Sequence, residues 1–193
     1  MKFTYAQGAT PYLDADAANL IPKHIMLQSE LNEWEQANIL EAERWLFARK
    51  REKILTSDFI QKVHYKMFEK TWKWAGKFRK YQTNIGCQFF EISPKLQQLL
   101  SDIEYYTIHS TYNSIETAIR LHHGLVYIHC FPNGNGRHAR MVADYFLINN
   151  GQERLSWGRG SLAYSGELRK RYIQALKQAD NHDFNDLIKF ANT

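Results

Sequence analysis

Apolar residues recur every three or four positions along most of the chain, which is the period of an amphipathic helix. The first such stripe lies in residues 29–51 and opens on Ser29, a favoured N-cap residue; its apolar members are Leu31, Trp34, Ala42, Trp45 and Leu46. Glu35 and Asn38 fall on the same stripe. Because a buried polar group costs free energy unless it is hydrogen-bonded, we expect both residues to have a partner or a function.

The same period predicts further helices at residues 57–71, 93–106, 114–129, 136–149, 167–178 and 184–190. The helix at 93–106 carries Ser93 as its N-cap and Pro94 at its first position. Only residues 77–92 lose the helical period, and there two short strands around a turn at 84–86 are expected. The pattern therefore predicts a mostly helical fold with one β-hairpin.

Composition limits the class of protein. The chain has 193 residues, 44% of them hydrophobic, which suits one domain with its own core. Residues 1–28 are irregular, so we expect an N-terminal arm followed by a domain over 29–193. There are 25 Lys and Arg against 20 Asp and Glu, a net charge of +5. This balance favours an anionic partner: a nucleotide, a nucleic acid or an acidic protein surface.

The cysteines and the N-terminal residues indicate the compartment. Cys87 and Cys130 form no C-x-x-C pair, so neither a disulfide framework nor a structural zinc site is expected. The N-terminal residues contain no apolar signal-peptide core, and no apolar run approaches the roughly 18 residues of a membrane span. These features predict a cytoplasmic protein with no membrane partner.

A glycine-punctuated loop joins two predicted helices, with the sequence HCFPNGNGRHAR over residues 129–140. Glycines let successive amides point inward, and the next helix adds unpaired N–H groups and positive potential, so the loop suits a phosphate. Arg137 and Arg140 supply guanidinium groups on one helical face, and Asn135 can donate or accept within the loop. His129 ends the buried stripe before the loop, and its near-neutral pKa suits accepting a proton from an attacking hydroxyl.

The loop resembles the signature H-x-F-x-(D/E)-G-N-G-R-x-x-R of the Fic domain family. The matching residues are His129, Phe131, Gly134, Asn135, Gly136, Arg137 and Arg140. Asn133 stands where the family has Asp or Glu. Residues 74–79 (WAGKFR) and 83–86 (TNIG) are similar to the segment that leads into the family's hairpin flap. The resemblance covers about residues 30–190 and is strongest to the small Fic proteins labelled mobile mystery protein B.

The resemblance implies an all-α Fic-like domain with a β-hairpin flap. It also implies an adenylyltransferase that moves AMP from ATP to a Ser, Thr or Tyr hydroxyl of a target protein. His129 would be the general base, and the flap around Ile85 and Gly86 would pair with the target's backbone. The nucleotide would be bound by Asn133, Gly134, Asn135, Gly136, Arg137 and Arg140.

Asn133 bears on the metal that the resemblance implies. Family members hold Mg²⁺ with the acidic residue at this position, whereas an amide offers only a neutral oxygen to a hard cation. We therefore expect weaker Mg²⁺ binding at Asn133, with the phosphates of ATP holding the ion. Phosphoryl transfer, or the use of another nucleotide by the same site, stays an alternative.

Many Fic proteins are restrained by a helix bearing (S/T)-x-x-x-E-(G/N), whose Glu pairs with the second arginine of the signature. The helix at 29–51 precedes the core, as in the family's N-terminal arrangement. Ser29 and Glu33 match the spacing, although Trp34 replaces Gly or Asn. Glu35, on the buried stripe, is the other candidate. An ordinary capped helix with solvated glutamates stays the alternative.

Other classes of function fit the residues less well. A cysteine-dependent phosphatase requires H-C-x5-R, but six residues separate Cys130 from Arg137. A nucleic-acid-binding module lacks a recognised motif, because the basic residues are scattered apart from a cluster at 169–171. A metal site built from the histidines lacks a carboxylate at ligand spacing; these are His122, His123, His129 and His138, of which His122 is expected in the core.

Overall fold

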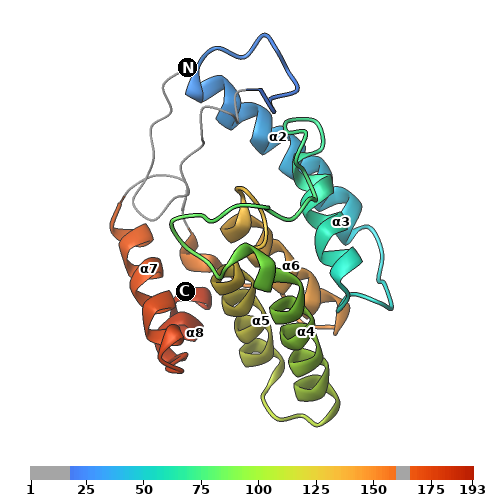
Figure 1. Ribbon diagram of the computed structural model, residues 1–193. Helices are drawn as coiled ribbons and strands as arrows, with labels where there is room; N and C mark the ends of the chain where they lie inside the picture. Colours follow the sequence, from blue (N-terminus) through green and yellow to red (C-terminus); the bar gives the residue numbers. More distant parts are fainter. Residues whose placement is uncertain (1–17, 160–165) are drawn as a thin grey trace.

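The computed structural model describes residues 18–159 and 166–193, which form a bundle of helices (Figure 1). The elements are α2 (Gln28–Phe47), α3 (Ser57–Phe68), η1 (Phe89–Glu91), α4 (Ile92–Ile108), α5 (Ser114–Ile128), α6 (Asn135–Asn149), η2 (Trp157–Arg159), α7 (Glu167–Asp180) and α8 (Asn185–Ala191). The predicted all-α class is confirmed. Most of the predicted N-terminal arm, residues 1–17, lies outside the described residues.

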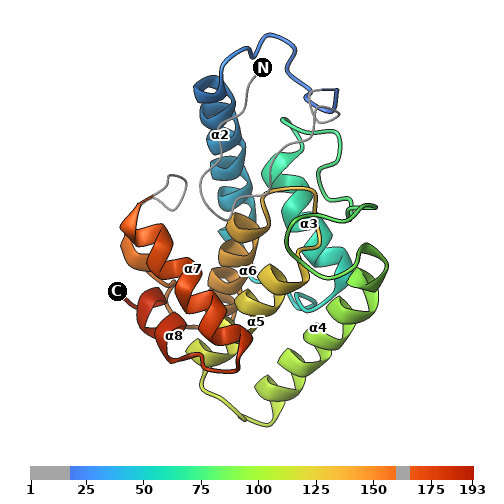
Figure 2. The same ribbon diagram turned by 60° about the vertical axis from the view of Figure 1, so that its left-hand side comes forward.

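The centre of the bundle is the α5–α6 pair. In both views, α7 and α8 lie on one side of this pair and α3 and α4 on the other (Figures 1 and 2). Helix α6 also packs against α2 and α3. Apolar side chains of α6 are buried on almost every face; they include Ala139, Met141, Val142, Ala143, Phe146 and Leu147. A helix buried on all sides is a rigid platform for the loop that precedes it.

The predicted strands of the hairpin are wrong. Residues 77–88, all of which the structure describes, contain no strand and run as a loop into η1. Each side of the predicted turn bonds to the end of α5 instead of to the other side: the Arg79 N–H donates to the Cys130 carbonyl (3.0 Å), and the Cys87 N–H to the Ile128 carbonyl (3.4 Å). Here "flap" means residues 79–87, which this pairing holds over α5.

Helix α2 ends at Phe47, four residues before the predicted end. The reason is Arg51, whose guanidinium turns back and donates to the carbonyls of Leu46 (2.7 Å) and Trp45 (3.0 Å). Its backbone is held by the Asn149 side chain of α6, which accepts from the Arg51 N–H and donates to the Arg51 carbonyl, both at 3.0 Å. The end of α2 is therefore capped and tied to α6.

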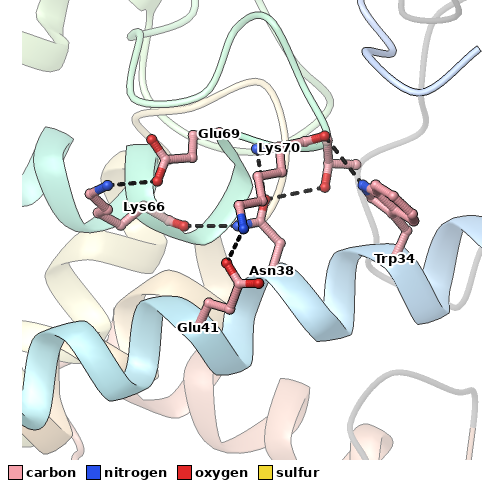
Figure 3. A network of polar contacts seen from close by, with 7 residues as sticks. Trp34, Asn38, Glu41, Lys66, Glu69 and Lys70 are labelled. Atoms are coloured by element: carbon pink, nitrogen blue, oxygen red, sulfur yellow. Dashed lines mark hydrogen bonds and ion pairs between the residues drawn. The ribbon is translucent and has the colours of Figure 1, made fainter.

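A polar network joins α2 to the end of α3 (Figure 3). The Asn38 side chain donates to the Lys66 carbonyl (3.1 Å) and accepts from the Lys70 N–H (2.9 Å). The indole of Trp34 donates to the Lys70 carbonyl (3.2 Å), and the Lys70 ammonium pairs with Glu41 at the surface. Asn38 lies on the buried stripe because it satisfies backbone groups that the end of α3 leaves unpaired.

Replacing Asn38 with Ala should lower the free energy of unfolding by about 1–3 kcal/mol, because the partly buried Lys66 carbonyl and Lys70 N–H each lose a partner. Urea denaturation followed by circular dichroism measures the change. Glu41→Gln removes only an exposed ion pair and should change stability by less than about 0.5 kcal/mol. Equal effects of the two substitutions would contradict the capping role of Asn38.

Candidate functional site

Helix α5 ends at His129, the residue that begins the signature loop. His129 adopts the left-handed conformation (φ 57°, ψ 61°), and its N–H donates to the Leu125 carbonyl (3.1 Å). This cap turns the chain sharply out of the helix. Gly86 of the flap packs directly on His129, and a Cβ at Gly86, which itself has φ 97°, would collide with the Cβ of His129. The flap glycine is required for this close approach.

Arg79 holds the flap and the end of α5 together. Its guanidinium is buried and donates to the carbonyls of His129 (2.7 Å), Tyr81 (3.0 Å), Ile128 (3.4 Å) and Cys87. A cation at a helix C-terminus is favourable because the last carbonyls lack helical partners. Arg79 belongs to the segment that resembles the family but was not among the predicted site residues. The available signal was an arginine in the middle of a glycine- and aromatic-rich segment.

The side chain of His129 is neutral at physiological pH. Burial lowers the pKa of His129 to about 4; a backbone hydrogen bond at Val126 acts in the opposite direction, and the charge of Arg79 adds to the lowering. A neutral imidazole can accept a proton, which is the state a general base requires.

His64 of α3 contacts the signature loop at Phe131 and Asn133. Its ring stacks on Phe131, with centroids 3.7 Å apart and planes at 9°. The Gly76 N–H donates to Nδ1 of His64 (2.9 Å), so the proton lies on Nε2, which donates to the Asn133 carbonyl (3.0 Å). Burial lowers the pKa of His64 well below its usual range, which keeps this neutral tautomer. His64 was not among the predicted site residues, because its spacing in the sequence indicates only that it belongs to a helix.

Polar side chains of the loop bind the loop's own backbone. Asn135 is buried, accepts from the Phe131 N–H (2.9 Å) and donates to the Phe131 carbonyl (2.8 Å). Asn133 accepts from the Gly134 N–H (2.6 Å). Both amides were expected to bind a nucleotide, but the hydrogen bonds of Asn135 indicate that this side chain sets the shape of the loop.

The two loop glycines serve different purposes. Gly134 has φ 78°, and a Cβ there would lie 2.5 Å from the ring of Phe68. A Cβ on Gly136 would meet only the guanidinium of Arg140, at 3.8 Å. Among the described residues, the N–H groups of Asn135 and Gly136 have no acceptor. Gly134 is thus needed for the turn, whereas Gly136 leaves the N-terminus of α6 open to an anion.

The two arginines of the loop have different partners. Arg137 lies over the ring of Phe68 (5.1 Å) and donates to Glu35 Oε2 at 2.6 Å. The guanidinium of Arg140 lies over the ring of Tyr172, 5.7 Å from its centroid. In the part of the chain that the structure describes, Arg140 has no carboxylate partner. One guanidinium is therefore neutralised by α2, and the other is available to an anion.

The structure distinguishes the two candidate glutamates. Glu35 is buried, and its second oxygen accepts from the Trp72 indole N–H (2.6 Å). Glu33 is exposed, and its side chain makes no hydrogen bond or ion pair with another described residue. The resemblance implied a pairing with the second arginine, Arg140. That pairing is not the one observed, because Glu35 reaches α6 at Arg137, one turn earlier.

Cys130 is not a thiolate. Burial raises the pKa of its thiol to about 12, and the nearby Cys87 adds to the rise. Its neighbours before the loop belong to helix α5 and not to a strand. A cysteine-dependent phosphatase needs an ionised, accessible sulfur. The local structure therefore speaks against that alternative.

Two further observations concern metals and membranes. Within residues 18–159 and 166–193, no three His, Cys, Asp or Glu side chains gather where they could hold a metal ion. None of the helices described is both long and apolar enough to cross a membrane.

Known proteins resemble the chain in sequence. Residues 54–147 match the model of the Fic/DOC family. The protein adenylyltransferase fic-1 of Caenorhabditis briggsae is 35% identical over 120 residues, which cover 60% of this chain and 22% of that protein. The protein adenylyltransferase fic-1 of Caenorhabditis elegans is 28% identical over 120 residues, with the same coverage. The chain thus spans about a fifth of the length of these curated relatives.

Solved structures share the fold. The BepC protein of Bartonella tribocorum with bound AMPPNP superposes with a TM-score of 0.69 at 17% identity and covers 97% of this chain and 93% of that chain. The N-terminal Fic domain of a putative cell filamentation protein of Bartonella quintana with bound ADP gives 0.70 at 17% identity, covering 94% and 92%. The match to the Fic/DOC family model supports a Fic domain over residues 54–147 of this chain, and the solved structures show that the chain has the same fold.

Proposed function

We propose that this chain is a protein adenylyltransferase that transfers AMP from ATP to a Ser, Thr or Tyr hydroxyl of a target protein. Its curated relatives carry the name protein adenylyltransferase, and solved structures of the same fold contain AMPPNP and ADP. The observation that supports the proposal is that one loop runs from the neutral His129 to the N-terminus of α6, where the N–H groups of Asn135 and Gly136 have no acceptor among the described residues. A proton acceptor and a phosphate-binding helix end in one loop are what this transfer requires.

The reaction is an in-line displacement. The hydroxyl oxygen of the target attacks the α-phosphorus of ATP, the new O–P bond forms, and the bond to the oxygen bridging the α- and β-phosphates breaks. Pyrophosphate leaves, and His129 accepts the hydroxyl proton. The phosphates of bound ATP would raise the pKa of His129 from about 4, because nearby negative charge favours the imidazolium. ATP binding would thus strengthen the base.

The loop supplies most of the phosphate contacts. The free N–H groups of Asn135 and Gly136 and the guanidinium of Arg140 would bind phosphate oxygens. Mg²⁺, when bound, would neutralise phosphate charge, and Asn133 Oδ1 is the loop side-chain oxygen that would contact it. A neutral amide oxygen that already accepts a hydrogen bond fits such an ion weakly, so the phosphates themselves would contribute most of its ligands.

The flap would position the target. Arg79 and Cys87 bind its two ends to α5, while Ile85 at its tip is exposed. The backbone between these anchors belongs to no strand among the described residues. An extended segment of the target could therefore pair with it and bring a hydroxyl to His129, since Gly86 packs on that histidine.

Glu35 would restrain the activity. Its carboxylate occupies Arg137, which the signature loop would otherwise present to the β- and γ-phosphates. A carboxylate and a phosphate compete for one guanidinium, so ATP binds productively only when Glu35 leaves. The domain of residues 29–193 would thus include α2 as an inhibitory helix.

Replacing His129 with Ala should reduce transfer by about 10²- to 10⁴-fold, because the general base is lost. The assay incubates the purified chain with Mg²⁺ and ATP labelled at either the α- or the γ-phosphate, and measures protein-bound label and released pyrophosphate. Label is expected from the α-phosphate alone. His109→Ala, at the exposed end of α4, is the control and should leave both signals unchanged.

Label from the γ-phosphate would instead indicate phosphoryl transfer. The absence of both label and pyrophosphate in every variant, including Glu35→Gln, would contradict the transfer activity itself.

Glu35→Gln should raise the rate of label incorporation about 5- to 150-fold, the usual range of a coupling free energy between two sites. The amide keeps the size of the side chain but cannot form an ion pair with Arg137. Glu33→Gln is the matched control, because Glu33 lies on the same helix and is exposed. The restraint assigned to Glu35 is wrong if the two variants label at the wild-type rate.

A further inference from the structure

The carboxylate of Glu35 is held by two donors from different parts of the chain. Oε2 accepts from Arg137 at 2.6 Å, and Oε1 accepts from the indole N–H of Trp72, also at 2.6 Å. Both Glu35 and Trp72 are buried, at 3% and 1% exposure. Each oxygen thus accepts from a different donor. One of these donors, Trp72, lies outside the phosphate-binding loop.

Trp72 is itself fixed in place. Its backbone N–H donates to the Phe68 carbonyl at the end of α3 (2.8 Å), and its ring stacks on Trp74 with centroids 5.1 Å apart and planes at 13°. Two residues earlier, the Lys70 N–H donates to Asn38, one turn along α2 from Glu35 (Figure 3). These contacts hold α2 and the segment at 70–72 in one register.

We propose that Trp72 is the positioning residue of the restraint: its indole N–H orients the Glu35 carboxylate so that Oε2 faces Arg137. This inference rests on the proposed function, in which Glu35 competes with ATP for Arg137. The hydrogen bond acts in two ways. It selects one orientation of the carboxylate plane, and it stabilises the negative charge of a side chain that is almost fully removed from water.

Loss of the indole N–H would remove a donor at 2.6 Å from one oxygen of a buried carboxylate. A buried acceptor that loses its partner carries a desolvation penalty, and this penalty falls on the paired state. Glu35 can escape it by turning toward solvent. This movement weakens the ion pair and frees Arg137 for phosphate.

The neighbouring tryptophan provides a matched control. Trp74 is the other ring of the stacked pair and is also buried, at 7% exposure. Its indole N–H has no acceptor among the described residues. Substitution of Trp74 by Phe therefore removes similar ring volume from the same stack without touching Glu35.

The experiment measures the dissociation constant of ATP by titration calorimetry. Trp72→Phe and Trp74→Phe are each tested in the wild-type chain and in the Glu35→Gln variant. We expect Trp72→Phe to tighten ATP binding about 3- to 10-fold, the equivalent of losing one hydrogen bond of ordinary net strength. Trp74→Phe should not tighten it. In the Glu35→Gln background, Trp72→Phe should add no further change, because the ion pair is already lost.

Two results would overturn the role of Trp72 alone. In the first, Glu35→Gln tightens ATP binding but Trp72→Phe does not. In the second, Trp72→Phe changes ATP binding equally in the wild-type chain and in the Glu35→Gln variant. Unchanged ATP binding in Glu35→Gln would overturn the restraint itself and the role of Trp72 with it. Circular dichroism checks that each variant folds. If Trp72→Phe does not fold, benzothienylalanine at position 72 keeps the ring size, lacks the N–H and carries the same expectation.

Discussion

The buried guanidinium of Arg79 is the contact on which the arrangement of the site depends. Helix α5 ends abruptly at a left-handed His129, and Arg79 donates to the carbonyls of both Ile128 and His129. The same side chain binds the carbonyls of Tyr81 and Cys87 in the flap. One cation thus satisfies the helix end and attaches the flap over His129. A backbone carbonyl left unpaired here would be costly, because the surroundings exclude water.

Neutral histidines make the loop rigid without adding charge to it. Nε2 of His64 donates to the Asn133 carbonyl, and that of His138 to the Ile60 carbonyl, both at 3.0 Å. Burial lowers the pKa of His138 to about 4 and that of His64 well below its usual range. The loop amides are therefore oriented before any anion arrives. Preorganised donors of this kind bind phosphate without reorganising at the moment of reaction.

The charges on α6 are asymmetric, and this asymmetry is the basis of the proposed control. Arg137 is neutralised by Glu35, while Arg140 rests on Tyr172, whose hydroxyl is hydrogen-bonded to His122 at 3.0 Å. An incoming nucleotide would meet one free guanidinium and one that is occupied. The strength of the restraint then follows from the hydrogen bonds that hold Glu35, which include one formed outside the loop.

Sequence periodicity alone determined the helices: the predicted starts near 57 and 114 agree with α3 and α5, because local side-chain spacing sets which face of a helix is apolar. The resemblance of the loop, read from adjacent residues, identified the family. Tertiary structure decided the rest. The predicted hairpin strands were wrong. Arg79, His64 and Trp72 were not predicted as site residues, because their hydrogen-bond partners lie 50, 69 and 37 residues away in the chain. Such contacts leave no periodic signal, since they form only when packing brings distant elements together.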